Sequence, residues 1–333
     1  MGASMLSRVA EAVYWMARYI ERAENVARFI DVNYNLTLGE GSALGHQWAP
    51  LIYTTGDEAL FEELYGQPTR QSVLQFLTYD QRNPNSIISC VNNARENARS
   101  VRDTITVPMW QQINTFYLLV RSAARQGQPL SDPNDFCDAV KIASHTLLGL
   151  TDATMSQNEA WHFGRMGMLM ERADKTSRIV DVQYYLLLPT AEEIGGSLDV
   201  VRWSALLRSA SALTMYRKLY GRITPTNVAR FLILDAEFPR AMHFCLVRAQ
   251  HSLCQITGSP MGTFRFQSEQ RMGRLRMELD YTSIDDIIRE GMHEYIDRFQ
   301  SQLNGLGSAI HDDFFRLHTE SAEPTQTQSQ STS

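Results

Sequence analysis

The sequence predicts an all-α protein, a multi-helix bundle of about a dozen helices. Apolar residues recur at steps of three and four along most of the chain, which is the spacing of helices that bury one face. Few stretches show the period of two that is typical of strands. The same residue pattern also returns about 150 positions later in the chain. These observations indicate a helical unit that occurs twice.

In the first half, the periodic stretches are separated by turn-forming residues. Gly39 to Gly45, Gly66 to Pro68, Asn83 to Ser86 and Gly127 to Pro133 interrupt the pattern, and such residues end helices. Ser86 stands where an N-cap residue is expected. The predicted helices cover 7–34, 48–66, 69–77, 87–105, 110–119 and 136–148.

The second half is expected to repeat this order. Its extra length falls in the loop from Pro189 to Ser197, which contains two adjacent glycines. The segment Gln267 to Leu279 is rich in Arg and Met, and Ile284 to Leu317 supplies the last helices. Thr319 to Ser333 is rich in Ser, Thr and Gln, so we expect a disordered tail over 319–333.

A tandem duplication explains the returning pattern. The run Glu21-Arg22-Ala23-Glu24 returns 150 residues later as Glu171-Arg172-Ala173-Asp174. At an offset of 155 the matches include Trp48 with Trp203 and Leu64-Tyr65-Gly66 with Leu219-Tyr220-Gly221. A unit of roughly 150 residues has the length of a domain. We therefore predict one helical domain over 5–318, built from two repeats (about 5–150 and 155–318) that are related by a pseudo-two-fold axis.

Composition limits the classes of function. The chain has 333 residues, 44% of them hydrophobic, and a net charge of −6, which argues against nucleic acid or an anionic membrane as partner. No apolar run reaches the length of a membrane span. The four cysteines are far apart in the sequence and are expected to be reduced and buried, as in a cytoplasmic protein.

Beside the apolar stripe of each repeat's first helix runs a stripe of charged residues. Its acidic members are Glu21, Glu24, Glu171 and Asp174, and its basic members are Arg18, Arg22, Arg28, Arg172 and Arg178. If the two helices face each other, the carboxylates could act as acid and base, and the arginines could bind a carboxylate or phosphate. The alternatives are a structural ion-pair network between the halves or a solvated face.

A second candidate binding site is the run Arg95-Glu96-Asn97-Ala98-Arg99. Its two arginines, Arg95 and Arg99, are four residues apart, so they share a helix face and could hold an anionic group. Asn97 has poor helix propensity, which hints at a hydrogen-bonding role. The alternative is an exposed ladder of charges four residues apart. The second repeat has Gln250, His251 and Ser252 at the matching positions, so any such site exists in the first repeat alone.

No cofactor or metal site is predicted. Glu159-x-x-His162 and Glu290-x-x-His293 have the spacing of di-metal carboxylate bundles, but neither has a partner at the duplicated position. No nucleophile motif and no phosphate-binding glycine loop occurs.

Several long motifs give the chain a family resemblance. They are Met5 to Ala10, Tyr14 to Tyr19, Glu21 to Glu24, Ala94 to Arg99, Arg202 to Ser209 and Phe238-Pro239-Arg240. With these motifs the chain resembles the bacterial alpha-E domain family over nearly all of residues 5–318. The family often has serine after its Phe-Pro-Arg, where this chain has Ala241.

The resemblance implies a role but no reaction. Genes of such proteins typically lie beside those of an ATP-grasp-type ligase and a transglutaminase-like peptidase, which implies these two as partners. We therefore expect a component of a peptide-ligase or peptide-modification system that binds or processes an amino acid or small peptide in a polar cavity between the repeats. The alternative is a non-catalytic scaffold or binding partner of the ligase.

Overall fold

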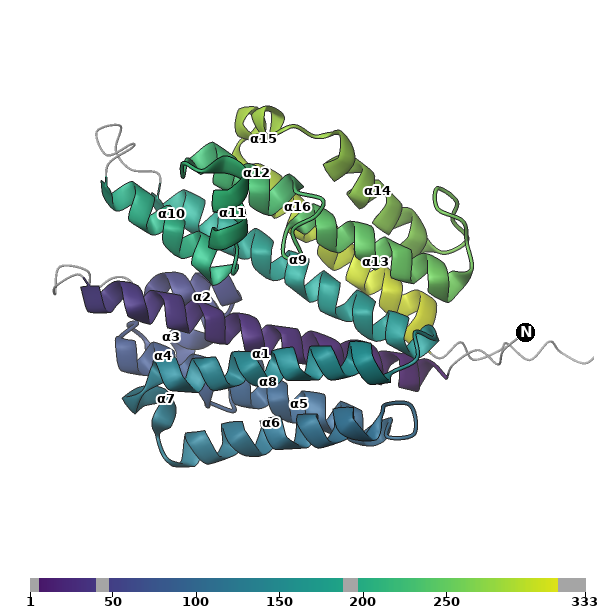
Figure 1. The fold of residues 1–333 in the computed structure, drawn as a ribbon, viewed down its shortest axis with the longest axis horizontal. Helices are drawn as coiled ribbons and strands as arrows, with labels where there is room; N and C mark the ends of the chain where they lie inside the picture. The colour runs from purple at the N-terminus through teal and green to yellow at the C-terminus, as the bar shows by residue number, and fades with distance from the viewer. Residues whose placement is uncertain (1–5, 40–47, 188–196, 317–333) are drawn as a thin grey trace, which may run out of the picture.

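The structure, a computed structural model, describes residues 6–39, 48–187 and 197–316 (Figure 1). Within these ranges it contains sixteen α-helices, one short π-helix and no strand. The first eight helices are α1 (Ser7–Gly39), α2 (Ala49–Thr55), α3 (Glu58–Tyr65), α4 (Arg70–Thr78), α5 (Ile87–Ser100), α6 (Val107–Arg125), α7 (Gln128–Ser131) and α8 (Pro133–Thr154). The others are α9 (Glu159–Leu187), α10 (Ser197–Ser209), α11 (Leu213–Tyr220), α12 (Pro225–Leu234), α13 (Met242–Thr257), α14 (Gln267–Tyr281), α15 (Ile284–Glu290), α16 (Met292–Ile310) and the π-helix η2 (His311–Phe315). The predicted all-α class is confirmed.

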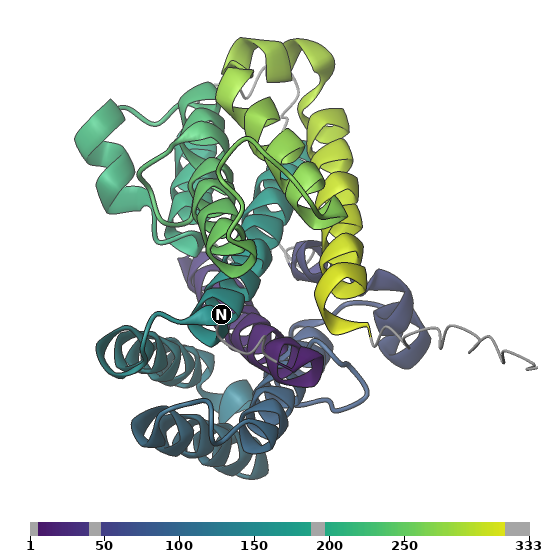
Figure 2. The ribbon, with the colours of Figure 1, turned by 90° about the vertical axis from the view of Figure 1, so that its right-hand side faces the viewer.

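The two longest helices, α1 and α9, pack side by side through the middle of the molecule (Figures 1 and 2). In the first half, α5 and α8 pack against α1. In the second half, α13 and α16 pack against α9. Each half also reaches across, because α2 packs against α9 and α10 packs against α1. The helices of the two halves thus surround one central pair.

The helices begin where side chains can cap them. Ser86 accepts a hydrogen bond from the backbone N–H of Ser89 at the start of α5, as predicted. Thr69 and Thr106 cap α4 and α6 in the same way. Such a bond satisfies one of the free N–H groups of a first helical turn. The caps therefore fix where α4, α5 and α6 begin.

Two hydrophobic cores lie on either side of the central pair. One is built from the first half together with Met155 and Ala160. The other is built from the second half, yet it includes Ala10, Tyr14 and Phe29 of α1. Because α1 contributes apolar side chains to both cores, it joins them.

Several predicted helix boundaries need correction. The segment 48–66 is two helices, because Gly56 takes a left-handed conformation (φ +77°) and ends α2. The predicted loop 127–133 contains the short helix α7, and α8 continues past Gly149 to Thr154. Residues 101–104 form turns beyond the end of α5. The short helices raise the number above the predicted dozen, and the predicted loop 189–197 and tail 319–333 fall almost wholly outside the described residues.

The order of long and short helices is the same in α1–α8 and in α9–α16. The duplication itself and the division into two repeats remain predictions, to be tested by superposition. No described helix has both the length and the apolar character needed to cross a lipid bilayer.

Candidate functional site

The two Glu-Arg turns, residues 21–24 on α1 and 171–174 on α9, face each other because the two helices approach very closely. A Cβ atom added to Gly167 would lie 2.5 Å from the carbonyl oxygen of Tyr14. One added to Gly164 would lie 3.2 Å from the Val13 side chain. Glycine at these two positions of α9 therefore lets the helix backbones meet. One turn further along, the charged side chains extend across the interface.

The charged side chains form two reciprocal pairs. Arg172 donates to both carboxylate oxygens of Glu21, at 3.0 and 2.8 Å. Arg22 donates to both carboxylate oxygens of Glu171, at 2.7 and 2.9 Å. Each glutamate is thus held in a bidentate pair by the arginine of the opposite helix, and both glutamates are at most 2% exposed. Bidentate guanidinium–carboxylate pairs are the most directional of ion pairs.

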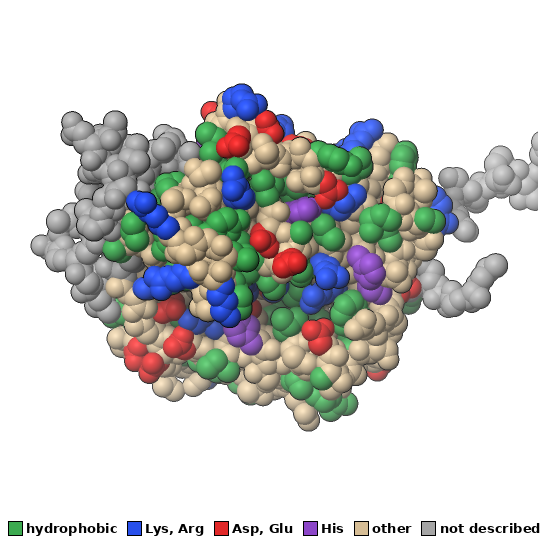
Figure 3. All heavy atoms as spheres, turned by 45° about the horizontal axis from the view of Figure 1, so that its top comes forward, with side chains coloured by type: hydrophobic (Ala, Val, Ile, Leu, Met, Phe, Trp, Pro, Cys, Tyr) green, Lys and Arg blue, Asp and Glu red, His purple; other side chains and the backbone are tan. Residues whose placement is uncertain are grey.

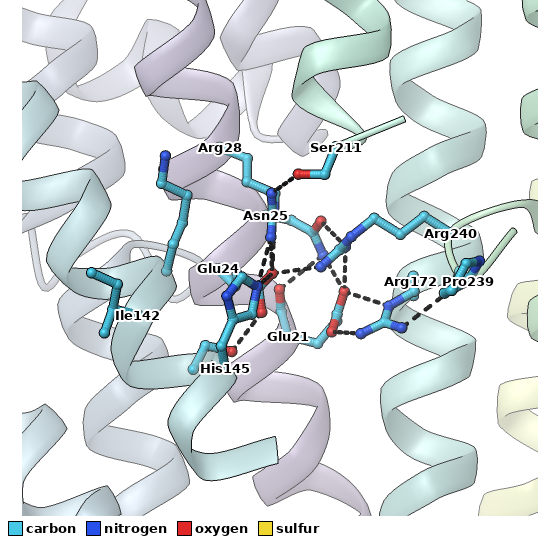
Figure 4. Close-up of polar contacts among 12 residues, drawn as sticks. Glu21, Glu24, Asn25, Arg28, Ile142, His145, Arg172, Ser211, Pro239 and Arg240 are labelled. Carbon is cyan, nitrogen blue, oxygen red and sulfur yellow. Dashed lines mark hydrogen bonds and ion pairs between the residues drawn. The ribbon is translucent and has the colours of Figure 1, made fainter. Parts of the chain in front are cut away.

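Arg240, which precedes α13, adds a second cation to the Glu21 side (Figure 4). Its Nη1 donates to Glu21 (2.8 Å) and to the side-chain oxygen of Asn25 (3.0 Å), and its Nη2 donates to Glu24. Asn25 in turn donates to Glu21 at 3.0 Å. Arg172 also donates to the backbone oxygen of Pro239 (3.3 Å). The loop before α13 is thereby tied to both central helices.

Glu24 is held by groups from α1 and α8. Arg28 donates to it from Nε at 2.9 Å, and the hydroxyl of Ser144 donates to its other oxygen at 2.6 Å. The Nε2 atom of His145 lies 3.1 Å from Glu24. Figure 4 shows Arg28 extending from α1 toward Ser211, with whose hydroxyl it is hydrogen bonded. Both carboxylate oxygens of Glu24 therefore accept hydrogen bonds.

The Glu171 side is built in a similar way. Arg18 donates from Nε to Glu171 at 2.9 Å, and Lys175 lies 3.8 Å away. Three residues after Glu171, the carboxylate of Asp174 accepts a hydrogen bond from Arg178 (3.0 Å) and lies 3.3 Å from the Lys175 amine. The guanidinium of Arg178 rests against Gly56, where a Cβ atom would be 2.7 Å from Nη1. The break between α2 and α3 thus makes room for this side chain.

A short chain of hydrogen bonds through the Asn85 side chain extends the site away from Glu171. Arg22 donates from Nη1 to the side-chain oxygen of Asn85 (2.6 Å), and Asn85 donates to Asp57 (2.7 Å). Asn85 precedes α5 as Arg240 precedes α13, at the same offset of 155 residues. Both residues contact the Glu-Arg turn of α1.

The cations keep the buried carboxylates ionised. Burial alone would raise the pKa of Glu171, but the charges of Arg22 and Arg18 outweigh it and hold the pKa far below its usual range. Burial likewise opposes ionisation of Glu24, yet the hydrogen bond from His145 and the charge of Arg240 lower its pKa well below normal. The pKa of Glu21 is lowered by Arg172 and Arg240 against the same burial. Ionised, saturated carboxylates hold no proton to donate near neutral pH.

The geometry therefore favours the ion-pair interpretation of the two charged stripes over the acid–base interpretation. A buried pair of this kind fixes the relative position of the elements that carry it, and removal of one partner leaves an uncompensated charge. The site can still present charge to a ligand where its outer members reach a cavity.

The largest of these cavities, which we call the α16 pocket, lies between α1, α9, α16 and η2 and has a volume of about 600 Å³. Arg18 and Asp174 line it together with Asp312 and His311. Its apolar walls come from Tyr14, Trp15, Met170, Leu303 and Phe315. The Arg18 guanidinium uses three of its five N–H groups on Glu171 and on the Tyr14 hydroxyl. Among the described residues, no further hydrogen bond or ion pair engages the other two N–H groups, so they can serve a ligand.

A second cavity, of about 300 Å³, opens at the other end of the network beside Arg28. Lys141, Arg208 and the strained Ser211 (φ +52°) line it, with Asp31 as the acidic member. Figure 3 shows lysine and arginine side chains gathered on the left of the visible face, beside a histidine. Lys141 is already paired with Asp31 (2.6 Å), so this cavity is closer to neutral than its number of cations suggests.

The Arg95–Arg99 run lies apart from the central network, on the side of α5 that faces α6 and solvent. Arg95 donates to Asn114 of α6 at 2.8 Å, and Glu96 pairs with Arg95 (3.0 Å) and Arg99 (2.6 Å). Asn97 is half-buried on the same helix. Within the described ranges, no hydrogen bond or ion pair joins this run to the Glu-Arg turns. Its carboxylate fills the fork between the two arginines, as in the ladder alternative.

The two Glu-x-x-His pairs do not assemble a metal site in the part of the chain that the structure describes. His162 contacts the Ser252 hydroxyl (3.3 Å), and His293 contacts Asp181 (2.8 Å).

Sequence reasoning missed several members of the network. Arg240 stands in the Phe238-Pro239-Arg240 motif that carries part of the resemblance, so the motif itself was the available signal. Asn25 directly follows the first Glu-Arg turn. Ser144 and His145 gave no signal, because their position opposite Glu24 depends on how α8 packs against α1.

Comparison with known proteins identifies a family match. A family model described as a predicted α-helical domain with a conserved ER motif matches residues 5–315. An uncharacterized protein of Mycobacterium bovis and one of Mycobacterium tuberculosis are each 23% identical to the chain over 274 residues, and a second M. tuberculosis sequence is 22% identical. These alignments cover 76% of this chain but 30% of each relative, so the chain spans about a third of their length. No solved structure matches.

Proposed function

Since the chain belongs to the Alpha-E family, we propose that its two Glu-Arg turns form a rigid, non-catalytic floor beneath a binding pocket for an amino acid or short peptide. The protein would supply this ligand to, or receive it from, a peptide-ligase or peptide-modifying system. An ATP-grasp-type ligase and a transglutaminase-like peptidase are the proposed partners.

One observation carries the proposal. The α16 pocket has at its base an arginine with free N–H groups, Arg18, and a carboxylate, Asp174. A zwitterionic ligand needs a cation for its carboxylate and an anion for its ammonium group. The volume of about 600 Å³ lies in the range of ligand pockets.

The ion-pair network supports a binding role over a catalytic one. Arg18 is fixed by Glu171, and Asp174 is fixed by Arg178 and Lys175. Charged groups held in this way bind a ligand with little loss of side-chain freedom. Their fixed ionisation suits recognition of charge, whereas acid–base catalysis needs groups that exchange protons near neutral pH.

The test is calorimetric binding of a dipeptide and a tripeptide, each also in N-acetylated and C-amidated form. We expect the free peptides to bind and each blocked form to bind at least tenfold more weakly. Ser308→Trp should abolish binding because Ser308 lines the pocket on an exposed side of α16. Ser301→Trp, an exposed position on the same helix outside the pocket, is the matched control.

Binding that survives Ser308→Trp, or equal binding of free and blocked peptides, would contradict the proposal. Co-purification with the ligase should be tested with the same two variants. A ligase complex that forms although no peptide binds would favour the scaffold alternative.

A further inference from the structure

A narrow slot of about 70 Å³ runs along the opposite side of α1, between α1, α8 and α9. It shares no lining residue with the α16 pocket. Its walls are apolar and rich in methionine: Val13, Met16, Ala17, Ile20, Met109, Leu147, Leu148, Met155, Ala160 and Met168. Methionine side chains are flexible, so such walls adapt to a ligand.

The two ends of the slot differ in charge. Glu21, Glu24 and Ser144 line one end, where Figure 4 shows both glutamates between α8 and α9. Arg165 and Trp161 line the other end, about two helical turns away along α9. The glutamates are saturated by the cations described above. Their end of the slot is therefore polar but already neutralised.

Arg165 is the basic residue that lines this slot. Among the described residues, none with a carboxyl group lies within ion-pair distance of it, although its side chain is half-buried. Its guanidinium lies 5.8 Å from the centre of the Trp161 ring. Burial lowers the pKa of Arg165, and the charges of Arg172 and Arg248 lower it further, against the opposing charge of Asp152, which also lines the slot. A half-buried cation among other cations favours an added anion.

We propose that this slot binds a short aliphatic carboxylate. The carboxylate pairs with Arg165, and the hydrocarbon chain lies among Met16, Leu148 and Met168. The cavity volume is about twice the roughly 30 Å³ that a water molecule occupies in the liquid. It therefore suits a chain of a few carbons and excludes long fatty acids. This inference does not depend on the peptide-binding proposal.

The probes are butanoate, acetate, 1-butanol and butylammonium, titrated into the full chain with binding followed by calorimetry. We expect butanoate to bind at least tenfold more tightly than each of the other three. Acetate lacks the chain, butanol lacks the charge, and butylammonium has the opposite charge. Trp161 beside Arg165 provides a second readout, because butanoate should change its fluorescence and Trp161→Phe should remove that change.

Three variants separate a ligand-binding arginine from a structural one. Arg165→Gln should weaken butanoate binding at least tenfold and leave the unfolding midpoint unchanged, since no ion pair is lost. Asp152→Asn should tighten binding, because it removes a nearby competing negative charge. Ala160→Leu should abolish binding by filling the slot. Arg125→Gln, at an exposed arginine on α6, is the control and should bind as the unaltered protein does.

Two outcomes would overturn the inference. One is equal binding of butanoate and butanol, which would leave an apolar slot with no role for Arg165. The other is unchanged butanoate affinity in both Arg165→Gln and Ala160→Leu. If Arg165→Gln fails to fold, the comparison of butanoate with butanol in the unaltered protein still decides the question, because a slot in which Arg165 has no role predicts equal binding of the two.

Discussion

At the scale of single residues, the main feature of the molecule is a set of buried glutamates that are held in ion pairs with arginines. Glu171 is completely buried and has Arg18, Arg22 and Lys175 around it. Replacing a whole buried ion pair by apolar residues changes stability little. Removing the carboxylate alone costs far more, because the remaining cation is still buried without a partner. The stability of the protein should therefore be most sensitive to substitutions that remove one partner of a pair. The loss can be measured for single substitutions.

Glu171→Gln should lower the free energy of unfolding by about 3–5 kcal/mol, because the Arg22 guanidinium loses its bidentate partner in a buried place. Urea unfolding at pH 7 measures the change. Glu96→Gln is the control, since Glu96 is 40% exposed and surface changes of this kind stay within about 0.5 kcal/mol. Equal effects of the two substitutions would show that the network does not stabilise the fold.

The lowered pKa values make a prediction about acid. A carboxyl group whose pKa is lower in the folded state stabilises the fold above its unfolded pKa, and this stabilisation disappears as the pH falls. Glu21, Glu24 and Glu171 all have lowered pKa values against an ordinary value of 4.5. The urea midpoint should therefore fall progressively below about pH 4.5. Glu171→Gln should show a shallower fall, and an identical pH profile would speak against its pairing.

The sequence predicted which residues of α1 and α9 carry charge, but it did not predict how they pair. Neighbours on one helix, such as Glu24 and Arg28, follow from a spacing of four. The reciprocal pairs depend on the relative position of two helices 150 residues apart. Nothing local distinguishes Arg22, which reaches across to Glu171, from an arginine that points to solvent.

At the scale of elements, caps and glycines decide where helices start and how closely they approach. Ser86 caps α5, and Ala241, which has no hydroxyl, occupies the same place before α13. The backbone oxygen of Asp235 accepts from the N–H of Phe244 instead (3.3 Å). One backbone N–H group of the first turn of α13 is therefore satisfied without a side-chain hydroxyl.

A pair of glycine substitutions tests the close approach of α1 and α9. Gly167→Ala should destabilise the protein by about 2 kcal/mol, because the new Cβ meets the backbone of Tyr14 and overpacking outweighs the better helix propensity. Gly149→Ala should stabilise it by about 0.5–1 kcal/mol, because Gly149 lies within α8 with nothing near its Cβ position. Thermal unfolding measures both. The same sign for both substitutions would contradict the tight approach.

Helix interiors were predictable from periodicity, and the cap of α5 was predictable from Ser86. The division of 48–66 was not, because Gly56 acts together with Arg178, which lies far away in the sequence. Short helices such as α7 were missed because four residues are too few to show a period.

At the scale of the whole molecule, α1 belongs to both halves. Its apolar residues enter both cores, and its charged residues pair with α9. Each half therefore lacks part of its packing when the other is absent. The all-α class followed directly from the sequence. This sharing of α1 did not, because it depends on which faces of two helices meet.

Residues 5–150 and 155–318, expressed separately, should each fail to show cooperative thermal unfolding, whereas the full chain should unfold in one transition. The reason is that separation exposes Tyr14 and Phe29 and strands Glu21 and Glu171 without their arginines. Mixing the fragments should restore a cooperative transition, followed by circular dichroism. A cooperative transition in one isolated fragment would show that the halves are independent domains.

The reciprocal pairs also determine when the protein can complete its fold during synthesis. Arg22 meets Glu171 across 149 residues of chain, although helical proteins usually fold through contacts close in sequence. Ribosomes add roughly 5–20 residues per second, so α1 waits on the order of 10–30 s before α9 emerges. During that interval Glu21 and Arg22 lack their partners on α9 and are open to water and ions.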